Sequence, residues 1–158
     1  MAVDISDGAL AVASSQDFSE EMSRTGAVGP KFVKADVLLG PESCPQICLV
    51  EGEGRCKFDI IVSNPPYVMD SEKALMRKNV LEHEPWLALF VPDDDPLLFY
   101  RAVAAWARQL LKPDGLCLVE INEALGRQTA EVFEDAGFRD VEVLQDLNSR
   151  DRFVRAIQ

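Results

Sequence analysis

The sequence predicts an α/β fold with a mostly parallel sheet and an antiparallel C-terminal strand. Strand-like apolar runs alternate with helical stripes along the 158 residues. The run Phe58–Val62 has the composition of a buried strand and stops at two prolines, which cannot continue a central ladder. The last two strand-like runs are joined by a polar segment too short for a crossover helix, so we expect them to pair antiparallel.

In the first third of the chain, a short strand is followed by Ser6 or Asp7, either of which can cap a helix. Prolines and glycines then predict a long loop with room for one further strand. The expected elements are a strand at Ala2–Ile5, a helix at Gly8–Ser15, a strand at Lys31–Ala35, and a loop at Gly40–Arg55 with a short strand at Ile47–Val50.

Beyond Phe58–Val62, a loop-rich stretch leads to Pro96, which can start a helix with a continuous apolar stripe. Gly137 is expected to end the last helix. The expected elements are a helical turn at Lys73–Asn79, a helix from Pro96 to Leu111, a strand at Leu116–Ile121, a helix at Glu123–Ala136, and strands at Phe138–Leu144 and Phe153–Ile157.

The chain carries a formal net charge of −11, with acidic residues in excess in both halves. This argues against nonspecific binding to nucleic acid or to an anionic membrane, because both require excess positive charge. No apolar run is long enough to span a bilayer, and the start does not resemble a signal peptide. We therefore expect a cytoplasmic protein without a membrane partner.

The four cysteines are most simply reduced thiols of a cytoplasmic protein. Cys44, Cys48 and Cys56 are close enough in sequence to suggest a zinc site. A fourth ligand is hard to find, because the only histidine is His83 and Cys117 lies in a strand-like run. We expect no metal.

The segment Asn64-Pro65-Pro66-Tyr67, directly after the strand Phe58–Val62, is the most informative motif. Ligands of open α/β sheets bind at the carboxyl ends of strands. The Asn64 amide oxygen and the Pro65 carbonyl can together accept two hydrogen bonds from one planar –NH2 group. Tyr67 offers a flat face for stacking. A plain proline-rich turn is the simpler alternative, but the preceding strand favours a site for a conjugated –NH2.

This motif resembles the signature of amino-methylating class I S-adenosylmethionine-dependent methyltransferases. The surrounding sequence narrows the resemblance to the HemK/PrmC family of protein-(glutamine-N5) methyltransferases, which modify the Gly-Gly-Gln glutamine of peptide-chain release factors. The matching segments cover essentially the whole chain: Ala2–Ser6, Glu84-Pro85, Phe99–Arg101, Glu120-Ile121 with Gln128, Gly137-Phe138, and Arg150–Arg152.

The resemblance implies a Rossmann-like methyltransferase sheet, S-adenosylmethionine as cofactor and a release factor as protein substrate. Asn64 and Pro65, with Pro66 and Tyr67, would bind the substrate amide and form the catalytic turn. Asn64 would also lie beside the cofactor. Asp4 would accept hydrogen bonds from the cofactor's ribose hydroxyls, and Asp36 with Val37 would lie against the adenine.

For other residues near these segments, the resemblance implies less specific roles. Glu120 either lines the pocket or is only a carboxylate at a helix entry. Arg150 and Arg152 are expected to be structural charges. Trp86 and His83 belong to a loop that could cover the site, and His83 is not expected to act as a base.

The sequence departs from the family pattern at its start. The first strand, the Gly-rich cofactor loop and the N-terminal helical domain of the family have no counterpart in residues 1–158, so we interpret the chain as the C-terminal part of the catalytic domain. We expect Phe58–Val62 to have an exposed apolar edge and this polypeptide to bind S-adenosylmethionine poorly.

Two other interpretations remain open. An adenine-N6 or other nucleic-acid amino-methyltransferase would also use Asn-Pro-Pro-Tyr, because adenine presents a conjugated –NH2, although the net charge of −11 opposes this. An inactive truncated remnant would keep the motif of an active ancestor.

Overall fold

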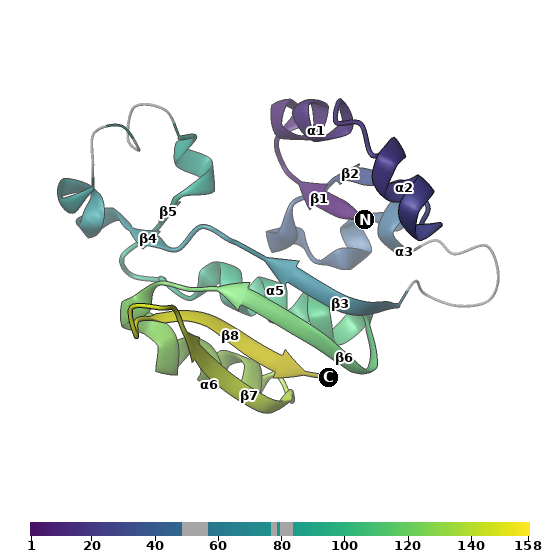
Figure 1. The fold of residues 1–158 in the computed structure, drawn as a ribbon. Helices are drawn as coiled ribbons and strands as arrows, with labels where there is room; N and C mark the ends of the chain where they lie inside the picture. Colours follow the sequence, from purple (N-terminus) through teal and green to yellow (C-terminus); the bar gives the residue numbers. More distant parts are fainter. Residues whose placement is uncertain (49–56, 77–78, 80–83) are drawn as a thin grey trace. The chain divides into compact units, whose positions relative to one another are not determined.

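The computed structural model describes residues 1–48, 57–76, 79 and 84–158. Figure 1 shows the fold. The chain divides into two compact units, Met1–Arg55 and Cys56–Gln158, and each is described by itself.

The first unit is built around a pair of short parallel strands, in which Val3 pairs with Val33. Its fully packed interior is small, since among the described residues of this unit only Pro41, Cys44 and Ile47 are buried. Its elements are β1 (Ala2–Asp4), α1 (Asp7–Ser14), α2 (Ser19–Thr25), β2 (Phe32–Lys34), the 3-10 turns η1 (Val37–Leu39) and η2 (Pro41–Ser43), and α3 (Pro45–Cys48).

Local chemistry explains where the helices of this unit begin and end. The Ser6 hydroxyl accepts a hydrogen bond from the Ala9 N–H at 3.2 Å, which confirms Ser6 as the cap of α1. Gly26 ends α2 in the left-handed conformation, with φ of 69°. The sequence analysis missed α2, whose polar sequence has no apolar stripe. The expected strand at Ile47–Val50 is wrong at Ile47, which lies in α3, and its last two residues fall outside the described ranges.

The second unit contains a four-stranded sheet in the order β3-β6-β8-β7. Strands β3 and β6 are parallel, and β8 runs antiparallel to both of its neighbours. The expected antiparallel pairing at the C-terminus is therefore confirmed. The strands are β3 (Phe58–Ser63), β6 (Leu111–Glu120), β7 (Arg139–Gln145) and β8 (Asp151–Ile157).

Strand β6 begins five residues earlier than the apolar run from Leu116 suggests. Leu111 pairs with Phe58 and Leu116 pairs with Ile60, so the register shifts and extra residues bulge out of the ladder. Asp114, within the bulge, has a φ of 64°. The strand includes this polar segment because Leu111, which is fully buried, already pairs with Phe58.

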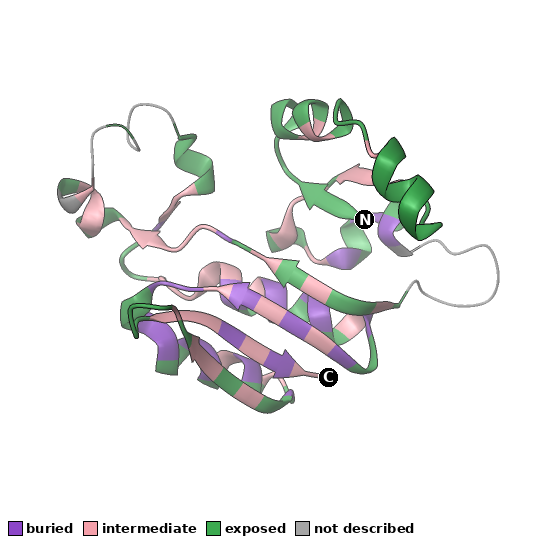
Figure 2. Ribbon diagram, in the orientation of Figure 1, coloured by how far each residue is buried: buried purple, intermediate pink, exposed green. Residues whose placement is uncertain are grey.

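Two amphipathic helices pack against this sheet, α5 (Leu98–Leu110) and α6 (Gly126–Asp135), the latter preceded by the 3-10 turn η5 (Glu123–Leu125). The register places Cys117 opposite Ala156 and Val119 opposite Val154 on one face, and all four are buried. This face and the two helices form the core of the unit (Figure 2). Gly137, with φ of 84°, follows the end of α6 as expected.

Strand β3 has a hydrogen-bonded neighbour on one side only, among the described residues. Ile60 and Val62 alternate onto the sheet face opposite to the buried one, in register with Leu116 and Leu118. Their exposed fractions are 57% and 69%. The expected apolar edge strand is therefore present, and Figure 2 shows that β3 is partly exposed.

A small lobe connects β3 to α5. It consists of the parallel pair β4 (Val68–Met69) and β5 (Phe90–Val91) and the 3-10 turns η3 (Asp70–Leu75) and η4 (Trp86–Ala88). The helical turn expected at Lys73–Asn79 overlaps η3, and residues 77–78 fall outside the described ranges. No helix in the described part of the chain is long and apolar enough to cross a membrane.

Candidate substrate site at the Asn-Pro-Pro-Tyr turn

The turn Asn64–Tyr67 starts at the carboxyl end of β3, where Ser63 is the last strand residue. Ser63 pairs with Val119 in the neighbouring parallel strand, so the next residues along, Asn64 and Glu120, lie at the same edge of the sheet. This is the edge at which α/β sheets bind ligands. The strand predicted directly before the motif is confirmed.

Acceptor atoms are available in this turn. Asn64 is exposed, and Pro65 is buried and anchors the turn. Among the described residues, neither the Asn64 side chain nor the Pro65 carbonyl has a hydrogen-bond partner. Proline lacks an N–H, so neither residue 65 nor residue 66 can donate from the backbone. The turn can therefore accept hydrogen bonds from a donor-rich group such as –NH2.

Tyr67 is held by hydrogen bonds to two parts of the unit. Its hydroxyl donates to Glu120 Oε1 at 2.8 Å, and its N–H donates to the Leu89 carbonyl at 3.2 Å. Burial, together with the hydrogen bond and negative charge of Glu120, raises the pKa of the Tyr67 phenol to about 12. Tyr67 therefore remains a neutral donor at physiological pH.

Glu120 is also close to a cation. Arg152 Nη1 lies 3.9 Å from Glu120 Oε1, and Arg152 Nη2 lies 3.4 Å from Asp146 Oδ2. Backbone hydrogen bonds from Arg150 and Asn148 lower the pKa of Asp146, which keeps it anionic. Arg152 thus lies close to two carboxylates, one of which accepts the Tyr67 hydroxyl. The Arg150 side chain instead pairs with Glu123 at 3.2 Å.

Asn122 is a contact residue of the turn that the sequence analysis missed. Its Nδ2 donates to the Tyr67 carbonyl at 3.2 Å and to Glu72 Oε2 at 2.9 Å. The signal was present, since Asn122 follows the carboxyl end of β6 by two residues, next to the edge that holds Asn64. An Asn there also resembles a helix cap, and it does cap η5 by accepting from the Ala124 N–H at 2.9 Å.

Three of the residues expected to bind cofactor, Asp4, Asp36 and Val37, belong to the first unit. Asp4 ends β1, and Asp36 lies two residues after β2, so both carboxylates follow adjacent parallel strands. Asp4 Oδ1 accepts from the Ser6 N–H at 2.7 Å. Asp36 Oδ1 accepts from the Leu38 N–H at 2.9 Å and caps η1, which Val37 opens. Asn64 and the rest of the turn belong to the second unit.

The carboxylates of Asp4 and Asp36 fit the donor-rich groups of a nucleoside. The hydrogen bonds from Ser6 to Asp4 and from Leu38 to Asp36 both go to Oδ1. A carboxylate can accept both hydroxyls of a cis-diol, and Asp4 is exposed. Acceptor carboxylates at these two positions are consistent with the expected ribose and adenine contacts.

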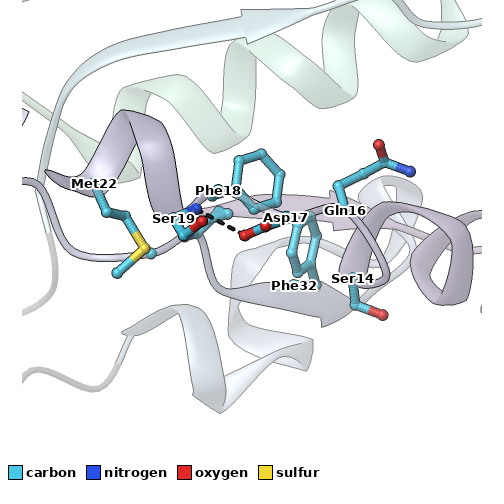
Figure 3. A pocket seen from close by; sticks show the side chains of 9 residues that line it. Ser14, Gln16, Asp17, Phe18, Ser19, Met22 and Phe32 are labelled. Carbon is cyan, nitrogen blue, oxygen red and sulfur yellow. Dashed lines mark hydrogen bonds between the residues drawn. The ribbon is translucent and has the colours of Figure 1, made fainter. Parts of the chain in front are cut away.

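A cavity of about 500 Å³ lies elsewhere in the first unit, at the ends of α1, α2 and β2. Figure 3 shows Phe18 and Phe32 in its wall, with Asp17 accepting a hydrogen bond from the Ser19 N–H at 2.9 Å. That hydrogen bond lowers the pKa of Asp17. None of the residues that line this cavity belongs to the expected substrate or cofactor site.

The aromatic residues of the lobe surround a lysine. Lys73 Nζ lies 4.5 Å from the ring centres of both Trp86 and Phe90, and Trp86 is 60% exposed. His83, which the sequence analysis placed in the same loop, is outside the described residues.

Within the described residues, no group of three or more histidine, cysteine or acidic side chains is arranged to hold a metal ion. Cys44 and Cys117 are buried free thiols. Burial raises the pKa of Cys117 to about 12. Cys56 lies outside the described residues.

Comparison with curated proteins finds relatives that are named as methyltransferases. The chain is 49% identical to the release factor glutamine methyltransferase of Bacteroides thetaiotaomicron over 106 residues, which cover 67% of this chain and 38% of that protein. It is 40% identical to the release factor glutamine methyltransferase of Flavobacterium psychrophilum over 154 residues, which cover 98% of this chain and 48% of that protein. The chain therefore spans less than half the length of these relatives.

Comparison with solved structures supports the fold. A methyltransferase from Pyrococcus furiosus superimposes with a TM-score of 0.54 at 14% identity, over 98% of this chain and 60% of that one. No family model matches the sequence. The likeness to the Pyrococcus structure shows the Rossmann-like class I methyltransferase fold alone, and the sequence identities are more specific. The chain belongs to the release factor glutamine methyltransferase family.

Proposed function

We propose that the protein carrying this chain transfers a methyl group from S-adenosylmethionine to the side-chain amide nitrogen of a glutamine in a peptide-chain release factor. The observation that supports this most directly is the turn at the end of β3. There the Asn64 amide oxygen and the Pro65 carbonyl have no partner among the described residues and are free to accept hydrogen bonds. The names of the curated relatives support the choice of substrate.

Binding by two acceptors suits a glutamine side chain. Its amide nitrogen is a poor nucleophile, because its lone pair is delocalised into the carbonyl. Asn64 and Pro65 would accept one hydrogen bond each from the –NH2 group and so orient the nitrogen. The same two oxygens would stabilise the positive charge that develops on nitrogen as the new bond forms. Tyr67 would stack beside the planar amide.

The reaction needs no strong base in this turn. Glu120 Oε1 already accepts the Tyr67 hydroxyl and lies near Arg152. We propose that the proton leaves the methylated nitrogen to water after transfer. The electrophilic methyl group is the contribution of the cofactor, and Asp4, Asp36 and Val37 are the residues of the first unit that would contact it. The proposed location of the reaction is the cytoplasm, where release factors act.

Methylation of adenine or another nucleic-acid base is the alternative that the motif itself allows. The net charge of −11 argues against it, because nucleic-acid binding requires cationic groups that displace counterions. The curated relatives named above favour the protein substrate.

The test compares Asn64→Ala with the wild type in a full-length enzyme that carries this segment. With labelled S-adenosylmethionine and purified release factor, we expect Asn64→Ala to lower the turnover number about hundredfold or more, as for the loss of one charge-stabilising contact. Asn148→Ala, in the exposed β7–β8 connection, is the matched control and should keep full activity. A near-normal rate for Asn64→Ala would refute the proposed role, and label in nucleic acid rather than in release factor would refute the substrate.

A further inference from the structure

Asn122 is a buried polar residue that makes hydrogen bonds through its backbone N–H and through both polar atoms of its side chain. Only 7% of its surface is exposed. Its Oδ1 accepts from the Ala124 N–H, its Nδ2 donates to both the Tyr67 carbonyl and Glu72 Oε2, and its own N–H donates to the Tyr100 hydroxyl at 3.1 Å. A helix cap alone needs the first of these hydrogen bonds. The two bonds from Nδ2 therefore require a second explanation.

Those two bonds converge on the segment that follows the Asn-Pro-Pro-Tyr turn. Glu72 Oε2 accepts from Asn122 Nδ2 and also from the Met69 N–H at 2.9 Å. One amide thus joins the end of β6 to the Tyr67 carbonyl directly and to β4 through Glu72. The segment Tyr67–Met69 is held at both of its ends.

A second side chain that contacts Tyr67, that of Glu120, also lies at the carboxyl end of β6. Glu120 accepts the Tyr67 hydroxyl at 2.8 Å. Glu120 therefore fixes the ring and Asn122 fixes the backbone carbonyl of one residue. Hydrogen bonds with buried or charged partners are costly to leave unmade, so the pair restricts Tyr67 more tightly than either contact alone.

We propose that Asn122, acting with Glu72, is a positioning residue that sets the orientation of Tyr67 and thereby of the substrate-binding turn. This inference rests on the function proposed above for the turn, and it assigns to Asn122 no contact with substrate. It predicts that the side-chain amide of Asn122 determines whether the Tyr67 hydroxyl can hydrogen-bond to Glu120.

The decisive variant is Asn122→Ser. Serine keeps a side-chain acceptor for the Ala124 N–H, so the cap of η5 is retained. Its short side chain cannot reach both Tyr67 and Glu72, so the positioning contacts are lost. Asn148→Ala, in an exposed turn, is the matched control. Glu72→Gln is the second variant, because it keeps the size of the side chain and weakens the acceptor of the Met69 N–H.

The first readout needs no enzymatic activity. The chain has two tyrosines, Tyr67 and Tyr100, so isotope-labelled tyrosine gives two ring signals by NMR. We expect Asn122→Ser to shift the Tyr67 signal toward that of Tyr67 in Glu120→Gln, where the carboxylate partner is removed. The Met69 N–H should exchange with solvent about tenfold faster. Its acceptor, Glu72, loses the hydrogen bond from the Asn122 side chain and is held less firmly. The Tyr100 hydroxyl accepts from the backbone N–H of residue 122, which serine keeps, so the Tyr100 signal is the internal reference.

An unchanged Tyr67 signal and an unchanged Met69 exchange rate in folded Asn122→Ser would overturn the inference, even if the variant melts at a lower temperature. If Asn122→Ser does not fold, Glu72→Gln decides, and an unchanged Met69 exchange rate in that variant overturns the inference.

A second readout connects the inference to catalysis. In the full-length enzyme, Asn122→Ser should raise the KM for a glutamine-containing substrate peptide about tenfold and leave the KM for S-adenosylmethionine unchanged. Equal increases in both would contradict a role in positioning the substrate turn. An inactive wild-type enzyme would refute the proposed function and would leave the NMR result standing.

Discussion

Tyr67 and Tyr100 are the only tyrosines of the chain, and hydrogen bonds link both to residues at the carboxyl end of β6. Tyr67 donates to a carboxylate, and Tyr100 is fully buried and accepts from the Asn122 N–H. Burial raises the pKa of both phenols. The edge of the sheet that carries the proposed chemistry therefore depends on two neutral phenols.

The pKa of Tyr67 makes stability depend on pH in the alkaline range. The folded-state pKa of about 12 lies above the ordinary phenol value of about 10. Below pH 10 the phenol is protonated in both the folded and unfolded states, and the stabilisation is complete. Between about pH 10 and pH 12 the unfolded chain loses its proton more readily, so the stabilisation is progressively lost.

We predict that Tyr67→Phe removes this contribution. The variant should be less stable than the wild type at pH 8, and the difference should shrink as the pH rises from 10 to 12. Urea unfolding followed by fluorescence measures both curves. Burial also raises the pKa of Tyr100, but Tyr100 is present in both proteins and contributes equally to the two curves. A constant difference across the range would contradict the prediction.

At the scale of elements, β3 combines two roles. Its carboxyl end leads into the Asn-Pro-Pro-Tyr turn, and its outer edge is unpaired among the described residues. Ile60 and Val62 expose 57% and 69% of their surface on this strand. An exposed, flat and apolar edge strand is a template for pairing with another chain.

We predict that the purified chain self-associates through β3. Val62→Thr keeps a β-branched side chain and makes the exposed surface more polar, so it should reduce association with little change in stability. Analytical ultracentrifugation over a range of concentrations measures the association. Val119→Thr is the informative contrast, because Val119 is fully buried in the adjacent strand, and this change should lower stability by about 1–3 kcal/mol. Equal association of Val62→Thr and the wild type would refute the role of this edge.

At the scale of the whole molecule, the two units differ in how much core they contain. Most of the fully buried apolar side chains belong to Cys56–Gln158, where they lie between the sheet and helices α5 and α6. Met1–Arg55 contributes three buried residues, Pro41, Cys44 and Ile47, among those described. Hydrophobic burial is the main favourable term in folding, so the second unit should carry most of the stability.

We predict that residues 56–158, produced alone, keep a cooperative thermal transition, whereas residues 1–55 alone show none. Calorimetry of the two pieces and of the whole chain tests this. A whole chain that unfolds cooperatively while residues 56–158 do not would show that the first unit supplies essential core contacts.

Much of this architecture could be predicted from local sequence. The apolar runs and the breakers after them located β3, β7, β8 and α5, and Ser6 and Gly137 marked helix ends. The shifted start of β6 could not be found in this way, because pairing across the sheet determines it. The polar helix α2 was missed because it has no apolar stripe and buries none of its residues. The motif Asn64–Tyr67 was evident because proline and a preceding strand leave a local signature. The contacts of Asn122 and Glu72 were not, since they join residues 50 positions apart.

Local sequence is enough to predict the α/β class and the position of the Asn-Pro-Pro-Tyr turn, because periodicity, prolines and a short motif are local properties of the chain. The surroundings of that turn follow from the tertiary fold. The neutral Tyr67, its Glu120 partner and the amide of Asn122 come together because parallel strands bring distant carboxyl ends to one edge of a sheet, and that proximity is not encoded in any single segment.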